Sequence, residues 1–273
     1  MVVRTKPLYF CVLFAFLVSG CTKQKPVEKK SYFKKDEFKQ SSSFRLPQHM
    51  SFDELKVEKE RHVKNQNESV AITFLGFMIK KCADPVELEK LRLEFADMLL
   101  KLGRCGEAAM EYQLYAQLYS GSKNAAYADF QALKALNCEV LSADRDQDRT
   151  QEVIDAAKKF AQKARVREDY AKYLPEVEKL AVACEARLCD AEMLHFYFNL
   201  NHGQFKAARA RLDWIKDHYN ACITEPAYLE LEYRYAAAIG DKKTAEQKLA
   251  LLTKKFPKYT VVRNKERSYA AWF

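Results

Sequence analysis

The chain has 273 residues, of which 48 % are hydrophobic, 12 % aromatic and 30 % charged, and only seven are glycine. This composition favours helices and argues against β-sandwich and dinucleotide-binding α/β folds, which need many glycine turns. The formal net charge is +9, but residues 1–21 carry +2 and residues 22–40 carry +4, which leaves +3 for residues 41–273. Nucleic-acid sites usually show a basic stripe with aromatic residues for stacking, and residues 41–273 have no such stripe, so no nucleic-acid partner is expected.

The first twenty residues are typical of a secretory signal peptide. Arg4 and Lys6 precede an apolar run at residues 8–18, and small residues follow the run. Eleven apolar residues are too few to span a bilayer comfortably, so residues 1–20 are predicted to be a removed signal rather than a membrane helix.

Cys21 follows the small residues Ser19 and Gly20 and resembles the lipidated cysteine of bacterial lipoproteins. A covalent lipid on this cysteine would hold the protein at a membrane surface, and no other cofactor is expected. The alternative is an ordinary signal peptide with a chance cysteine. Thr22 stands where an aspartate would resemble the inner-membrane retention signal of enteric bacteria, which favours the periplasmic face of the outer membrane.

Two polar segments flank a predicted helical domain at residues 51–258. Residues 21–50 are rich in lysine and predict a flexible tether. Residues 259–273 predict a basic tail, which is either solvated or in contact with an acidic partner or lipid headgroups.

Apolar residues recur every three to four positions from Ser51 onward, which predicts about ten helices in five hairpins. An unusually long helix is predicted from Leu174 to about Asn199. Four segments place a small alanine four residues before a large side chain, with pairs at Ala71–Leu75, Ala108–Tyr112, Ala208–Leu212 and Ala245–Leu249. The first two alanines are 37 residues apart, as are the last two, and such a period indicates stacked helical hairpins.

This pattern resembles the tetratricopeptide repeat, in which a small residue lets two helices approach closely. The last copy fits best, because Leu252 and Pro257 follow Ala245 and Leu249 at the expected distances. In an earlier copy, Trp214 is expected to pack on a neighbouring helix.

Six cysteines lie in the predicted helical domain, and none forms a CxxC pair or has a histidine at zinc-site spacing. Cys105 and Cys138 are expected near matching ends of adjacent hairpins, and Cys189 and Cys222 near the opposite ends of later ones. Either pair is a candidate disulfide in an exported protein, and the sequence leaves the connectivity open.

An aspartate- and arginine-rich stretch, "DRDQDRTQEV", leads into the predicted long helix, and a segment with an aromatic residue, alanines and an arginine follows. Together these features resemble the BamD family, lipoproteins of the outer-membrane β-barrel assembly machine. The residues that carry the resemblance are Asp144, Arg145, Asp146, Phe160, Glu192, Phe196, Tyr197, Gly203, Phe205, Ala207 and Arg211.

The resemblance implies a non-enzymatic adaptor that docks on a BamA-like outer membrane protein through its C-terminal repeats, beside other assembly-machine lipoproteins. It makes Arg211, Asp144, Arg145 and Asp146 candidate partner-binding residues. It also implies that the N-terminal repeats bind unfolded outer membrane protein clients. Candidate client contacts by position are Phe95, Leu99, Tyr112 and Tyr115, and core packing is the alternative role for these four.

Other functions stay open. Periplasmic repeat-scaffold lipoproteins that serve cell-wall synthesis or secretin assembly share the anchor and the repeats. An enzyme is not indicated, because the chain has no GxSxG, HExxH or glycine-rich phosphate motif. Glu192 and His195 form one Glu-x-x-His pair where a di-iron centre needs two, so no metal site is predicted.

Overall fold

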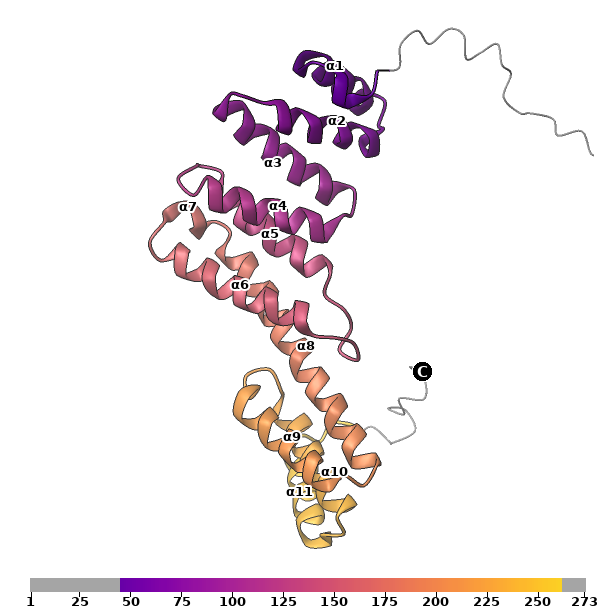
Figure 1. The fold of residues 1–273 in the computed structure, drawn as a ribbon. Helices are drawn as coiled ribbons and strands as arrows, with labels where there is room; N and C mark the ends of the chain where they lie inside the picture. Colours follow the sequence, from indigo (N-terminus) through magenta and orange to yellow (C-terminus); the bar gives the residue numbers. More distant parts are fainter. Residues whose placement is uncertain (1–44, 262–273) are drawn as a thin grey trace, which may run out of the picture. The chain divides into compact units, whose positions relative to one another are not determined.

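The computed structural model describes residues 45–261, which contain eleven α-helices and one short 3-10 helix and no β-strand (Figure 1). The predicted all-α fold is therefore confirmed for these residues. Their bounds are η2 (Pro47–His49), α1 (Phe52–Lys64), α2 (Glu68–Lys81), α3 (Pro85–Lys101), α4 (Cys105–Leu118), α5 (Ala125–Cys138), α6 (Asp148–Ala164), α7 (Glu168–Ala171), α8 (Leu174–Asn201), α9 (Phe205–His218), α10 (Glu225–Ala238) and α11 (Lys242–Lys255).

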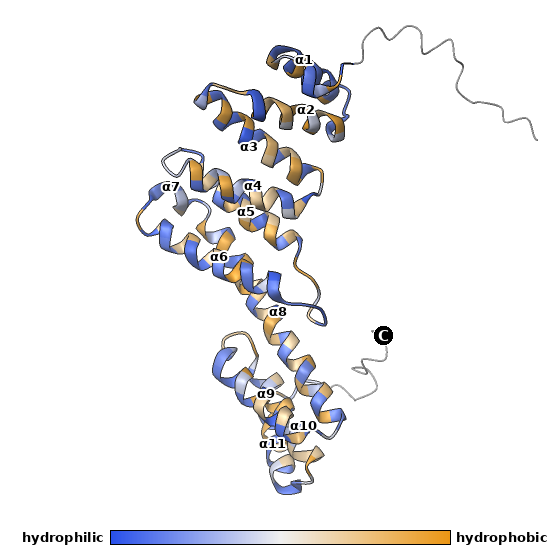
Figure 2. Ribbon diagram, in the orientation of Figure 1, coloured by the Kyte–Doolittle hydropathy of each residue, from blue (hydrophilic) through white to orange (hydrophobic). Residues whose placement is uncertain are grey.

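Each helix packs mainly against the helices beside it in the chain. α1 packs on α2, α3 on α4, α4 on α5, and α10 on α11. α8 packs on both α6 and α9, and the four-residue α7 touches α5, α6 and α8 (Figure 1). Figure 2 shows why the neighbours matter: α1 is largely hydrophilic, while α2 is largely hydrophobic and needs cover on more than one side.

Several helices begin at residues that cap free backbone N–H groups. The Ser51 hydroxyl accepts a hydrogen bond from the Glu54 N–H, and the Glu54 carboxylate accepts one from the Ser51 N–H. Asp84 and Asp241 cap α3 and α11 through their carboxylates. Caps of this kind stabilise a helix by about 1 kcal/mol each.

The tight turns between paired helices require a left-handed backbone conformation. Gly103, Gly203 and Gly240 have φ angles of 73°, 71° and 81°, and Gln66 has a φ of 56° at the turn between α1 and α2. Gln66 and Gly103 are 37 residues apart, as are Gly203 and Gly240. The turns therefore repeat with the same period as the alanines. At the first turn the left-handed conformation of Gln66 is destabilising by about 1 kcal/mol, because its Cβ lies close to the following carbonyl oxygen.

The alanines of the repeat, and most of the large residues four positions after them, lie in the core. Ala71, Ala108 and Ala208 are fully buried, and Ala245 is 7 % exposed. The large residues four positions later are buried in three copies, whereas Leu249 is only half-buried. Pro257 is exposed just after the end of α11.

Buried apolar side chains form three clusters within the described residues. The first spans α1–α3, the largest spans α2–α8, and the third spans α8–α10. α8 supplies Val177 and Cys184 to the largest cluster and Phe196 and Tyr197 to the third. The long helix predicted from the sequence is present and ends two residues later than expected, at Asn201.

The described part of the helical domain extends slightly past its predicted limits. Lys81 donates hydrogen bonds to the carbonyls of Gln48 and Met50, which the sequence assigned to the tether. The Tyr259 hydroxyl donates to the buried Glu230 carboxylate over 2.7 Å, although the sequence assigned this tyrosine to the tail. The predicted signal peptide, the Cys21 lipid site, the tether up to residue 44 and the tail from residue 262 lie outside the described residues.

The prediction for Trp214 is wrong. Its side chain is 46 % exposed and stacks on His218 of the same helix, with ring centroids 3.6 Å apart. The residues on either side, Leu212 and Ile215, are the ones that α9 buries.

Candidate functional site

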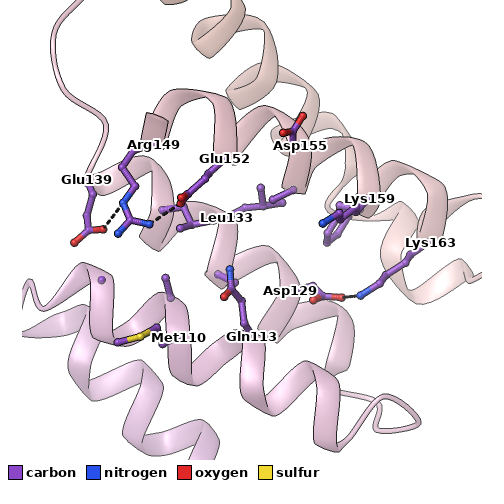
Figure 3. A pocket seen from close by; sticks show the side chains of 16 residues that line it. Met110, Gln113, Asp129, Leu133, Glu139, Arg149, Glu152, Asp155, Lys159 and Lys163 are labelled. Carbon is purple, nitrogen blue, oxygen red and sulfur yellow. Dashed lines mark hydrogen bonds and ion pairs between the residues drawn. The ribbon is translucent and has the colours of Figure 1, made fainter. Parts of the chain in front are cut away.

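A hollow in the described residues, here called the central groove, has a volume of about 740 Å³ and lies among α4, α5 and α6 (Figure 3). Its apolar lining includes small side chains, which leave the space open. The apolar lining residues are Ala109, Met110, Ala132, Leu133, Leu136, Ala156 and Phe160. Pockets of this size and character commonly hold ligands or segments of other proteins.

A cluster of three charges closes one end of the central groove, where Figure 3 shows Arg149 between two glutamates. The Arg149 guanidinium donates to the Glu152 carboxylate over 2.5 Å, and its Nε lies 3.4 Å from Oε2 of Glu139. The second contact is an ion pair without hydrogen-bond geometry, so the buried Oε2 of Glu139 has no hydrogen-bond donor in the described part of the chain. Gly106 makes room for this carboxylate, because a Cβ there would lie 2.5 Å from Oε1 of Glu139.

The opposite end of the central groove is held by Asp129 (Figure 3). Its Oδ2 accepts hydrogen bonds from Lys163 over 2.5 Å and from the Tyr170 hydroxyl over 2.6 Å. Burial, and then the bond to Asp129, raises the pKa of Tyr170, so its hydroxyl stays a proton donor. Between the two ends, Lys159 lines the groove and has no ion-pair or hydrogen-bond partner among residues 45–261.

A second hollow of about 500 Å³, here called the α2–α4 groove, lies among α2, α3 and α4. Its polar lining includes Lys80, Arg92, Arg104 and Glu111, and its apolar lining includes Ile72, Phe77, Ile79 and Phe95. Arg92 approaches Glu111 to 3.7 Å, and its buried Nε has no hydrogen-bond acceptor within the described residues. Arg104 is paired with Glu107, and the Lys80 ammonium lies 5.2 Å from the centroid of the Phe77 ring, so Lys80 is the cation of this lining without a carboxylate partner among the described residues.

The two grooves occupy equivalent places in the chain. Ile72 and Thr73 of the α2–α4 groove are 37 residues before Ala109 and Met110 of the central groove, and Gly76 is 37 residues before Gln113. The same periodicity that repeats the turns and the buried alanines therefore repeats the hollows.

One of the two candidate disulfides is present. Cys105 and Cys138 are bonded, with Cα atoms 6.1 Å apart. The bond joins the first residue of α4 to the last residue of α5, and the next residues, Gly106 and Glu139, line the central groove.

The other candidate disulfide is a wrong prediction, because Cys189 and Cys222 are free thiols. Both contribute to the apolar cluster of α8–α10. Burial raises the pKa of Cys189 to about 11, which keeps the thiol neutral and unreactive at pH 7.

Three of the four candidate client contacts are core residues, so their predicted role is wrong in this structure. Leu99, Tyr112 and Tyr115 are each 1 % exposed. The Tyr112 hydroxyl donates to Asp97 over 2.6 Å, and the Tyr115 hydroxyl donates to Glu89 over 2.7 Å. Because each carboxylate accepts a hydrogen bond from a tyrosine hydroxyl, both phenol rings can be buried in the core. The fourth candidate, Phe95, is partly buried and lines the α2–α4 groove.

Replacing Glu89 with glutamine is expected to lower the free energy of unfolding at pH 7 by about 1–2 kcal/mol, because charge-assisted hydrogen bonds become neutral ones. Bonds from Ser122, and then from Tyr115, hold the pKa of Glu89 below its ordinary value. The stabilisation is thus present above the unfolded-state pKa and is lost as the pH falls through the folded-state pKa. Denaturation over a pH series should show the difference between wild type and variant shrinking on acidification, while Glu87→Gln serves as the control. A difference that stays constant down to the acid transition would contradict this account.

The candidate partner-binding residues Asp144, Arg145 and Asp146 are exposed together on the loop between α5 and α6. The Asp146 carboxylate accepts a hydrogen bond from the Asp148 N–H, and the loop backbone is held by further side chains. Gln147 donates to the carbonyls of Ser142 and Arg145, and Arg187 of α8 donates to the carbonyl of Leu141.

The remaining candidate, Arg211, lies on a different element and is paired within the chain. Its Nη1 donates to both oxygens of Glu192 on α8, over 2.8 and 3.1 Å, and its side chain is 43 % exposed. The sequence singled out both residues without predicting that they meet.

The groove residues Arg149, Glu152, Lys159 and Lys163 were missed by the sequence analysis. The available signal was their spacing along α6, where charges recur every three to four residues beside Ala156 and Phe160. A charged helix face of this kind usually predicts exposure to solvent. It becomes one wall of a groove only because α4 lies opposite it.

No group of three or more histidine, cysteine, aspartate or glutamate residues that could hold a metal ion is found in residues 45–261. Among these residues no helix has the length and apolar character needed to cross a membrane. Neither a protein family nor a curated protein matches the sequence.

Proposed function

We propose that this protein is a non-enzymatic adaptor lipoprotein of the outer membrane β-barrel assembly machinery. The observation that carries the proposal is the pair of equivalent, open, apolar-lined grooves at a 37-residue interval. Repeated grooves of this kind suit the holding of segments of other proteins. The resemblance of residues 144–219 to the BamD family supplies the choice of machinery.

The proposed architecture is a tetratricopeptide-like superhelix of five hairpins, α1–α2, α3–α4, α5–α6, α8–α9 and α10–α11. Its support is the shared period of the left-handed turns, the buried alanines and the grooves. In such a stack each hairpin buries the apolar face of the next.

In the proposed division of labour, the lipid on Cys21 holds the protein on the periplasmic face of the outer membrane. The C-terminal helices dock on a BamA-like protein, with Arg211 as one contact. Clients bind toward the N-terminus, in the α2–α4 groove that Phe95 lines. The other three candidate client contacts are buried and have no part in this binding. A desolvated arginine is a frequent anchor at protein interfaces, which supports the choice of Arg211.

The test is a pull-down from detergent-solubilised outer membranes with the tagged full-length chain. Wild type is expected to retain a BamA-like barrel protein with periplasmic domains, and Arg211→Glu is expected to retain at least about tenfold less. Capture of a cell-wall synthase or a secretin in place of the barrel protein would overturn the assembly function and favour the alternative scaffold role.

A charge swap serves as the matched control for this variant, because Arg211 also pairs with Glu192. The double variant Glu192→Arg, Arg211→Glu restores an ion pair between α8 and α9. If Arg211 contacts the partner, the double variant stays deficient. Recovery of the barrel protein by the double variant would show that Arg211 only braces the two helices.

A further inference from the structure

The central groove has the dimensions and lining of a peptide site. Its volume of about 740 Å³ falls within the range of known ligand pockets, and its alanines leave room for side chains from elsewhere. A single small ion would leave most of this apolar surface uncovered, so the occupant must bring apolar groups.

The end of the groove at Glu139 calls for a positively charged or N–H donating group. Two carboxylates, Glu139 and Glu152, share one guanidinium, that of Arg149, which leaves one negative charge uncompensated. The buried Oε2 of Glu139 also lacks a hydrogen-bond donor within the described residues, and a buried unsatisfied acceptor is costly.

The middle of the groove calls for a carboxylate. The Lys159 ammonium has no partner in the described part of the chain, whereas the nearby Lys163 is engaged by Asp129. Asp155 lies one turn before Lys159, but its carboxylate accepts from Gln151 and lies 3.9 Å from Lys158. The groove therefore presents one unmatched cation about ten residues along α6 from the anionic end.

The spacing of these charges sets the length of the occupant. Ten residues of helix between Arg149 and Lys159 rise about 15 Å. An extended chain advances about 3.3 Å per residue, so about five residues bridge the two charges.

We propose that the central groove binds an extended peptide segment of about five residues, with a basic residue at one end, apolar residues between, and a carboxylate paired with Lys159 at the other end. The proposal rests on the proposed function, since an adaptor's occupant is a segment of a client or partner protein. The basic end lies against Glu139 and Glu152, and the apolar residues cover Leu133 and Phe160.

The experiment uses a fluorescent peptide, Lys-Leu-Val-Leu-Glu with both termini capped, and measures anisotropy against the full mature chain. Saturable binding is expected below about 1 mM. Lys159→Glu is expected to weaken binding at least tenfold, while Lys158→Glu, the same charge change one residue away, changes it less than about twofold. A peptide with lysine in place of its glutamate should regain affinity for Lys159→Glu.

Two further peptides separate the sources of the carboxylate. One ends in a free C-terminal carboxylate in place of the glutamate, and one has glutamine there. Tighter binding of the free-acid peptide than of the capped one would identify a chain terminus as the occupant, and the reverse order would identify an internal acidic residue. Equal binding of the glutamate and glutamine peptides would overturn the pairing with Lys159.

Failure here is distinguishable from failure of the proposed function. Absence of saturable peptide binding, or equal binding by wild type and Lys159→Glu, would overturn the groove proposal even when wild type still retains the barrel protein in the pull-down. Circular dichroism of each variant checks that the helices are intact, so a loss of binding is not a loss of fold.

Discussion

Replacing both Cys105 and Cys138 with serine is expected to lower the free energy of unfolding by about 3.7 kcal/mol. The bond closes a loop between residues 33 apart in sequence, and a cross-link of that span restricts the unfolded chain by roughly this amount. Urea denaturation of the oxidised wild type and the double variant, followed by circular dichroism, measures the difference.

Reduced wild type is the first control for this prediction, because dithiothreitol should reproduce the midpoint of the double variant. Cys82→Ser is the second control, since Cys82 is a free thiol and its loss should leave the midpoint unchanged. Equal midpoints for oxidised wild type and the double variant would show that the bond adds nothing to stability. Because Gly106 and Glu139 adjoin the two bonded cysteines, the double variant should also bind the capped peptide more weakly.

Phe196→Ala is expected to lower the free energy of unfolding by about 4 kcal/mol. The ring is fully buried in the α8–α10 cluster beside Leu212 and Ile215, and removing a buried aromatic ring leaves a cavity that the neighbours cannot fill. Denaturation measures the total change. Hydrogen exchange locates it, and protection should fall more in α9–α11 than in α3–α5, whose largest cluster does not include Phe196.

Phe198→Ala is the matched control for this variant. Phe198 is two residues away on the same helix but 53 % exposed, so its replacement should cost less than about 1 kcal/mol. A similar loss of protection in α3–α5 and α9–α11 would show that the described helices unfold as one unit. The largest cluster and the α8–α10 cluster would then not differ in local stability.

Local sterics explain what the sequence predicted well. A buried alanine is required where the two helices of one hairpin approach closely, so the 37-residue period of the alanines could be read from the sequence. The long helix α8 was predicted for the same reason, because no glycine, and no proline beyond its first turn, interrupts Leu174–Asn201. The left-handed turns were not predicted, and the one at Gln66 has no glycine to indicate it.

The errors concern residues whose setting depends on distant partners. Tyr112 and Tyr115 carry hydroxyls that could equally face solvent, and the decision to bury them depends on Asp97 and Glu89 of α3. The choice between the two cysteine pairs depends on distances between helices, which no spacing along the chain fixes. The central groove was missed for a related reason, since three separate helices contribute its walls.

The helix α8 constrains how this chain can be divided into shorter fragments. Within one continuous segment it carries Val177 and Cys184 for one cluster and Cys189 and Phe196 for another. A fragment that stops after α7 uncovers part of the largest cluster, and a fragment that starts at α9 lacks one wall of its own core. The largest cluster takes residues of α8 up to Leu188, and the α8–α10 cluster takes residues of α8 from Cys189 onward. A division that leaves both clusters covered therefore has to fall within this helix.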